Sequence, residues 1–250
     1  MTKYAFLYSG GVIERYNYNR YANDLGFAYK VLTEKHHYLK ENVAVMYANG
    51  STLQYDNLKI DTSPAKNNTF LAKMDEYGKI IQPDDVFTFV ISNHGGENGE
   101  LFSWDEAMPI QMPDVLTALN KIKCVKIILM GQCYGGNYTY FEIENSIVVS
   151  ANIPNEVSYC KMTIGNGIYI ADKSNEYDEF LYNFFSYCNG SYPCGKPLHC
   201  TEINNTVFSA YEYSKNNDFF RNGIMIGGKQ YKEIPCIKCN IGATYRNINI

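Results

Sequence analysis

The stretch that decides the fold is VFTFVISNHGG at residues 86–96, and it has a counterpart in VKIILMGQCYGG at residues 125–136. Each opens with about six mostly β-branched or aromatic residues, as expected for a buried strand, and then breaks into glycine. In an open parallel sheet, the residues just past the carboxyl ends of the strands share one crevice. We therefore expect His94 and Cys133, which follow the two strands, to be neighbours in space.

A thiol beside an imidazole is the minimal set of groups for nucleophilic catalysis. Cys133 would be the nucleophile, and His94 would act first as general base and then as the acid that protonates a leaving amine. The N–H groups of Cys133 and Gly95 are the natural oxyanion donors, because glycine lets a substrate approach the backbone closely. Taken alone, Cys133 would be interpreted as a small buried core residue and His94 as an ordinary loop histidine. The two matching strand-then-glycine contexts together favour catalysis.

The rest of the chain alternates strands with helices, which predicts an α/β fold with a mainly parallel sheet and helices on both faces. Residues 51–82 are mostly polar, residues 101–104 could form an extra strand or hairpin, and the tail from residue 227 has no pattern that places it. Further strands are expected at residues 3–8, 43–47 and 146–151, and helices after a cap at Asn23 and Asp24 and near residues 69–77, 112–122, 176–187 and 206–220.

Length and composition narrow the classes of function. A chain of 250 residues with 46% hydrophobic residues can bury a substantial core, and without a repeat or linker we expect one domain over residues 1–250. The net charge of −4 offers no basic surface to nucleic acid. No apolar run approaches the roughly 18 residues that span a bilayer. The first apolar run is also too short for a signal peptide, so we expect a cytoplasmic protein, or a lysosomal or secreted one if the chain is a trimmed mature form.

The eight cysteines leave the redox compartment open. Cys236 and Cys239 have the spacing of half a zinc knuckle, but no second short pair completes it. Free thiols or disulfides are therefore favoured, and we expect neither a metal ion nor a cofactor. The remaining ligands of a zinc site with Cys236 and Cys239 would have to come from Cys188, Cys194, Cys200 or His199.

Several motifs resemble the legumain branch of the caspase-like cysteine peptidases. The Cys-x-Gly element around Cys133 is similar to the caspase nucleophile motif, and His94-Gly95 resembles the catalytic histidine motif of the family. The stretches YNYNR at residues 16–20 and ANIPNEVSY at residues 151–159 resemble two legumain motifs, each with one inserted residue. The resemblance covers roughly residues 3–185, and the part from about residue 188 is unmatched.

The resemblance implies a caspase/legumain-like three-layer sandwich and adds site residues. Asn17 would orient His94, although the insertion makes Asn19 a competitor. Arg20, Glu156 and Asp178 would line the pocket for the residue before the scissile bond. A pocket with both an arginine and acidic groups suits a side-chain amide, which has one acceptor and two donors.

The sequence therefore predicts a cysteine endopeptidase that cleaves peptide or protein substrates after asparagine, or aspartate, through a thioester acyl-enzyme. An amine that replaced water would make the same site a transamidase or peptide ligase, as in the related GPI-anchor transamidase. A non-catalytic binding module on the same fold is a third possibility, and the intact His94 and Cys133 argue against it.

Overall fold

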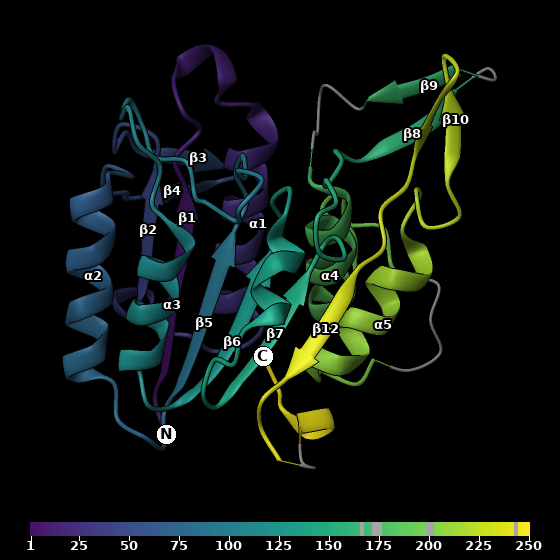
Figure 1. Ribbon diagram of the computed structural model, residues 1–250. Helices are drawn as coiled ribbons and strands as arrows, with labels where there is room; N and C mark the ends of the chain where they lie inside the picture. Colours follow the sequence, from purple (N-terminus) through teal and green to yellow (C-terminus); the bar gives the residue numbers. More distant parts are fainter. Residues whose placement is uncertain (166–167, 172–176, 199–202, 243–244) are drawn as a thin grey trace.

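A six-stranded sheet lies at the centre of the computed structural model, which describes residues 1–165, 168–171, 177–198, 203–242 and 245–250 (Figure 1). The strand order is β12-β7-β6-β5-β1-β2. Neighbouring strands are parallel except β12, which pairs with β7 in the antiparallel sense. The strands are β1 (Lys3–Ser9), β2 (Val43–Tyr47), β5 (Val86–Ile91), β6 (Val125–Met130), β7 (Ser146–Ser150) and β12 (Cys236–Cys239).

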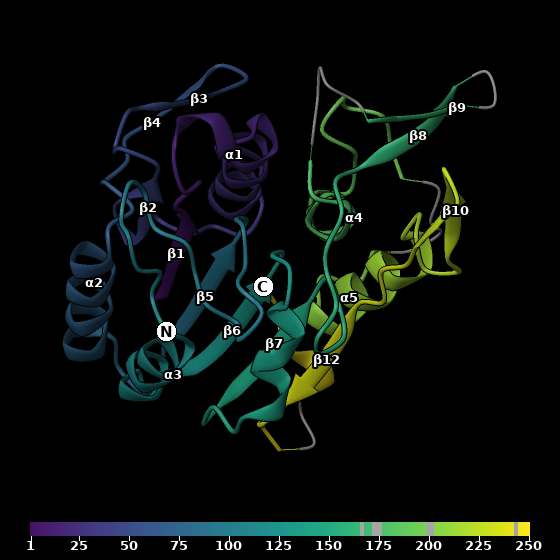
Figure 2. The same ribbon diagram turned by 45° about the horizontal axis from the view of Figure 1, so that its top comes forward.

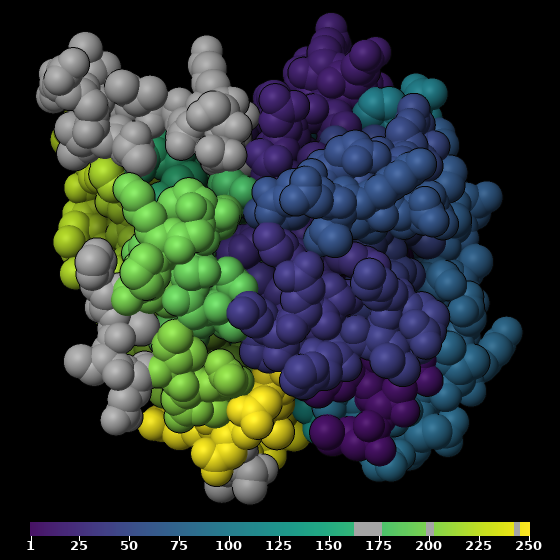
Figure 3. All heavy atoms as spheres, turned by 180° about the vertical axis from the view of Figure 1, so that it is seen from behind, coloured from purple at the N-terminus to yellow at the C-terminus, as the bar shows by residue number. Residues whose placement is uncertain are grey.

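Helices cover both faces of this sheet, as Figure 2 shows. One face carries α2 (Asn67–Ile80) and α3 (Met112–Lys121), and the other carries α1 (Asn19–Glu34), α4 (Glu179–Asn189) and α5 (Val207–Asn217). Seen from behind, α1, α4 and α5 hide the sheet from solvent (Figure 3). The predicted three-layer arrangement with a mainly parallel sheet is confirmed.

Strand β5 shows why the central strands read as continuous apolar runs. All six of its residues are buried, because helices cover both faces of the sheet. Phe87, Phe89 and Ile91 belong to the core beneath α2 and α3, whereas Val86 and Val90 belong to the core beneath α1 and α4. This double burial fixes the strand in the middle of the sheet and leaves its carboxyl end to present a loop.

Three short hairpins and four 3₁₀ helices complete the described chain. The β8–β9 hairpin and strand β10 lie beyond the carboxyl ends of the parallel strands, at the top of Figure 1. The hairpins pair β3 (Leu53–Tyr55) with β4 (Leu58–Ile60), β8 (Met162–Gly165) with β9 (Ile168–Ala171), and β10 (Ile224–Ile226) with β11 (Lys229–Tyr231). The 3₁₀ helices are η1 (Glu14–Tyr16), η2 (Lys40–Asn42), η3 (Gly135–Tyr140) and η4 (Tyr245–Asn247).

Several boundaries differ from the sequence-based expectation. Helix α1 begins at Asn19, so Asp24 lies inside the helix and does not cap it. Residues 101–104 form no strand, and Leu101 makes only isolated bridges to Gly95 and Ile110. The unplaced tail supplies β11 and the edge strand β12. Residue 176, the expected start of the fourth helix, lies outside the described residues, and α4 begins at Glu179.

No disulfide joins any two of the seven described cysteines, and Cys200 and His199 lie outside the described residues. In the same described part of the chain, no three His, Cys, Asp or Glu side chains gather in a way that could hold a metal ion. Nor does that part contain a helix with the length and apolarity that crossing a membrane requires.

Candidate active site

Strand register brings the loops of His94 and Cys133 to the same place. Ile91, the last residue of β5, pairs with Met130, the last residue of β6. His94 and Cys133 are each the third residue beyond that pair, at the same edge of the sheet. The two loops touch, because a Cβ atom on Gly95 would lie 1.9 Å from the carbonyl oxygen of Cys133. Only glycine permits this approach.

The imidazole of His94 is fixed by a backbone carbonyl. Its Nε2 lies 2.9 Å from the carbonyl oxygen of Tyr16. Because a carbonyl only accepts hydrogen bonds, the neutral ring carries its hydrogen on Nε2 and has its lone pair on Nδ1. The ring packs against Tyr18 and Tyr21, with centroids 5.1 and 5.4 Å away. Burial, together with the positive charge of Arg20, lowers the pKa of His94, which favours the basic form.

The thiol of Cys133 lies beside residue Ser158. The N–H of Ser158 is 3.4 Å from the sulfur, and the Ser158 hydroxyl is 3.7 Å away. Cys133 is partly exposed, as a nucleophile must be. The next residue, Tyr134, has a φ of 58°, a left-handed conformation that turns the chain sharply into η3.

Asn152, for which no role was predicted, holds this turn. It is fully buried, its Oδ1 accepts the N–H of Gly136, and its Nδ2 donates to the carbonyl oxygen of Gln132. The two bonds flank Cys133 in the chain. Since Asn152 is the second residue beyond β7, the next strand in the sheet positions the cysteine loop.

Arg20 lies between two of the tyrosines that surround the imidazole. Its guanidinium carbon is 4.5 Å from the ring centre of Tyr18 and 4.9 Å from that of Tyr21. Its Nη2 also donates to the hydroxyl of Tyr21 at 3.3 Å. Burial lowers the pKa of Arg20, but the neighbouring acidic groups of Tyr21, Cys160, Asp178 and Asp24 outweigh it and raise the pKa. Asp178 thus influences the pKa of Arg20, but the described residues contain no ion pair between the two side chains.

Asp178 has a buried carboxyl neighbour, Asp24, that the sequence did not reveal. The N–H of Asp178 is 3.1 Å from Oδ1 of Asp24, and the Ser92 hydroxyl donates to Oδ2 at 2.5 Å. Burial raises the pKa of Asp24 to about 7, and burial and the charge of Asp24 raise the pKa of Asp178. Asp178 also accepts the N–H of Leu181 as the N-cap of α4. Because residues 23–24 were interpreted as a helix cap, the pairing of Asp24 with Asp178 was not predicted.

Two predicted residues occupy other surroundings. Asn17 donates through Nδ2 to the hydroxyl of Tyr47 at 2.9 Å, and in the described chain it makes no hydrogen bond to His94. The carbonyl of Tyr16 takes the orienting position because the chain turns through η1 just before Asn17. Asn19, the alternative, is the exposed first residue of α1. Glu156 is exposed, and its carbonyl oxygen accepts the N–H of Tyr134 at 2.7 Å.

A solved caspase-1 from Spodoptera frugiperda matches this arrangement of strands and helices with a TM-score of 0.57. The match covers 96% of this chain and 87% of that chain, at 10% sequence identity. The chain has the caspase-like fold. No family model and no curated protein matches its sequence.

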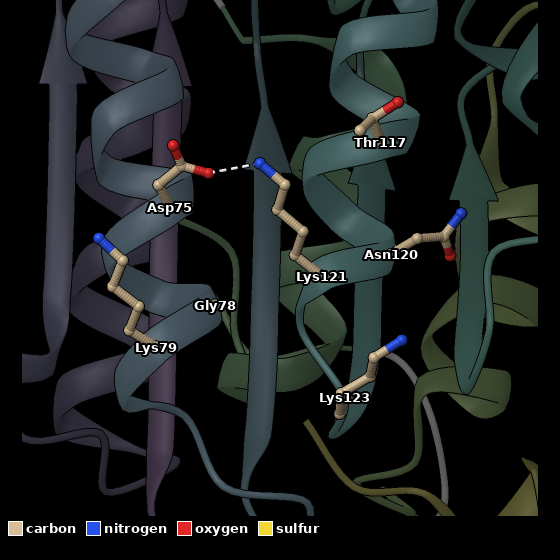
Figure 4. Close-up of a pocket in the computed structure, with 7 residues that line it drawn as sticks. All are labelled: Asp75, Gly78, Lys79, Thr117, Asn120, Lys121 and Lys123. Carbon is tan, nitrogen blue, oxygen red and sulfur yellow. Dashed lines mark hydrogen bonds and ion pairs between the residues drawn. The ribbon is translucent and has the colours of Figure 1, made fainter.

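Two hollows lie at opposite ends of the caspase-like fold. One, of about 380 Å³, adjoins the imidazole of His94. The larger, of about 810 Å³, lies between the carboxyl-terminal ends of α2 and α3. Figure 4 shows Asp75 of α2 and Lys121 of α3 reaching each other across it, 2.6 Å apart. Lys123 on its rim is paired with Glu144. The charges of this larger hollow are largely neutralised, and it contains neither a thiol nor an imidazole.

Proposed function

We propose that the chain is a cysteine endopeptidase that uses Cys133 and His94 to cleave peptide bonds after asparagine or aspartate. The observation that carries the proposal is the equal offset of the two residues from a registered pair of neighbouring parallel strands. A crevice at the carboxyl ends of such strands is where ligands bind in open α/β sheets. The caspase-like fold is consistent with this chemistry.

The proposed reaction uses the free lone pair on Nδ1 of His94. Nδ1 of His94 takes the thiol proton, and the thiolate of Cys133 attacks the scissile carbonyl carbon. In the described chain, the N–H groups of Gly95 and Cys133 donate to no protein acceptor, so both are available to the oxyanion. His94 then gives its proton to the departing amine, which leaves a thioester. Water attacks the thioester, and the carboxylic acid product and free thiol are released.

Arg20 and the buried acids would recognise the side chain before the scissile bond. The guanidinium can donate to the amide oxygen of asparagine, and Asp178 can accept from the amide nitrogen. Aspartate would present two acceptors, so it would be favoured only where the substrate or pocket carboxyl is protonated. The legumain-like motifs around Arg20 and Glu156 favour this specificity, and the exposed side chain of Glu156 is accessible to a substrate.

The same thioester would support transamidation or ligation when an amine reaches it before water does. A non-catalytic binding module is the candidate from a different class. The thiol and the imidazole are both partly exposed, and the imidazole lines a hollow, which favours the enzyme.

The first test is cleavage of a fluorogenic peptide that contains one asparagine. We expect the wild-type chain to cleave it and Cys133→Ala to lose essentially all activity, whereas Cys194→Ala, which removes an exposed thiol, keeps the wild-type rate. An electrophilic asparaginyl peptide should label Cys133. Equal rates for wild type and Cys133→Ala, or a Cys133 that resists the label at both acidic and neutral pH, would exclude the peptidase.

A further inference from the structure

The hollow next to His94 has an apolar lining. Its six lining residues come from the loop after β1, the loop after β5 and the segment that follows, and the imidazole is their only titrating group near neutral pH. Its volume of about 380 Å³ lies in the range of small-ligand sites, about 300–1,000 Å³. The lining residues are Val12, Tyr16, Tyr18, His94, Gly95 and Phe102.

The walls of this hollow are held in place by the backbone. Val12 has a φ of 65°, an unusual conformation for a β-branched residue, and its carbonyl oxygen accepts the N–H of Asp105 at 2.6 Å. The carbonyl oxygen of Phe102 accepts from the Asn93 amide at 2.6 Å and from the Tyr8 hydroxyl at 3.2 Å. Strained, well-anchored backbone of this kind is typical of binding sites.

The position of the hollow indicates which part of a peptide would occupy it. In the proposed reaction, His94 protonates the departing amine, so the residue that carries this amine must lie beside the imidazole. The acyl part stays on Cys133, whose sulfur faces Ser158. The Tyr18 ring contacts Arg20 and also lines the hollow, so it separates the asparagine-binding groups from the hollow.

We propose that this hollow is the subsite for the residue immediately after the scissile bond, and that it selects an apolar or aromatic side chain there. The proposal rests on the proposed peptidase function. Phe102 and Val12 supply apolar contact, and the faces of Tyr16 and Tyr18 suit a ring or a branched aliphatic chain. No lining carboxylate or ammonium group is present to pair with a charged side chain.

The test uses quenched peptides that keep asparagine before the bond and vary only the next residue among Leu, Phe, Gly, Asp and Lys. We expect kcat/KM for Leu and Phe to exceed that for Gly and Asp by about tenfold or more, the usual discrimination of an apolar pocket. Phe102→Lys should reverse the order of Leu and Asp. Tyr140→Lys is the matched control, because Tyr140 is 65% exposed outside the hollow, and it should keep the wild-type order.

A second measurement needs no variant. Leucinamide and aspartic acid amide compete with water for the acyl-enzyme, and the ratio of ligated to hydrolysed product reports binding of the leaving-side residue. We expect leucinamide to be incorporated about tenfold more than aspartic acid amide. Cleavage of the whole peptide series at equal rates, or a preference that follows a residue before the bond, would overturn the proposed subsite. The proposed peptidase function would still stand. A wild-type chain that cleaves no peptide and resists the electrophilic label would remove the peptidase function and this inference with it.

Discussion

Single backbone positions set the spacing of the candidate catalytic groups. The α-carbon of Gly95 packs on the carbonyl of Cys133, and the left-handed Tyr134 turns the cysteine loop toward it. Two hydrogen bonds of the buried Asn152 fix that loop from the neighbouring strand. The spacing of the two loops is therefore set by a backbone contact and by two residues, Tyr134 and Asn152, that take no part in the proposed reaction.

Gly95→Ala tests this contact. The added Cβ would meet a backbone oxygen at 1.9 Å, so the two loops must move apart. A displacement of about 1 Å can lower the rate about a hundredfold, and we expect kcat for the asparaginyl peptide to fall by that order. Gly242→Ala is the control, because nothing lies within 4 Å of its Cβ position, and it should retain full activity. Wild-type kcat in Gly95→Ala would show that the loop contact does not control the site.

At the scale of elements, two helices converge on the buried carboxyl pair. Helix α1 contributes Arg20 and Asp24 within its first two turns, and α4 begins directly after Asp178. The N–H of Asp178 bonds to Asp24, so the start of α4 is tied to the side of α1. The proposed asparagine pocket thus lies where one helix begins against another.

Two variants separate the roles of Asp178. Asp178→Asn keeps an oxygen for the N–H of Leu181, whereas Asp178→Ala removes the cap and should lower the free energy of unfolding by about 1 kcal/mol relative to Asp178→Asn. If the carboxyl also binds substrate, both variants should raise KM for asparaginyl peptides, by about tenfold. Urea unfolding and steady-state kinetics measure the two effects. An unchanged KM in both variants would show that Asp178 caps α4 but does not bind the substrate.

At the scale of the whole molecule, buried acids make stability depend on pH. Besides Asp24 and Asp178, the chain buries a second pair of acids, Asp218 and Glu233, whose Oδ2 and Oε1 atoms have no hydrogen-bond partner among the described residues. Burial raises the pKa of Asp218 to about 7, and burial and the charge of Asp218 raise the pKa of Glu233. Glu233 also accepts the N–H of Tyr159 at 2.6 Å, next to the residue that contacts the thiol.

The free energy of unfolding should therefore fall as the pH rises from about 4 to about 7. In this window the unfolded chain loses the protons of Asp24 and Asp218 while the folded chain keeps them, so rising pH favours unfolding. Each group contributes on the order of 3 kcal/mol to the change. Urea titrations at pH 4.5 and 7.5 measure it, and Asp218→Asn should make the difference smaller. Equal stability at the two pH values would show that these acids are ionised in the folded chain.

The strands and the candidate nucleophile were within reach of the sequence, whereas the surroundings of the site were not. Apolar runs of strand length followed by glycine placed His94 and Cys133 correctly at adjoining loops. Asn17 was expected to orient the imidazole, but the backbone carbonyl of Tyr16 bonds to it instead. Every residue has a backbone carbonyl, so the sequence could not single this one out. Asp24 was interpreted as a helix cap because the residue type alone does not distinguish a buried aspartate from one that caps a helix.

What the sequence determined by itself was local: which runs are buried, where glycine ends them, and hence that a thiol and an imidazole follow neighbouring strands. Hydrophobic periodicity and backbone preference act over a few residues, so they can be read along the chain. The tertiary structure alone decided what surrounds those groups: the tyrosines and Arg20 around His94, the buried pairing of Asp24 with Asp178, and the hollow between Val12 and Phe102. These contacts join segments far apart in the chain, and their energies depend on burial and orientation, which exist only once the chain has folded.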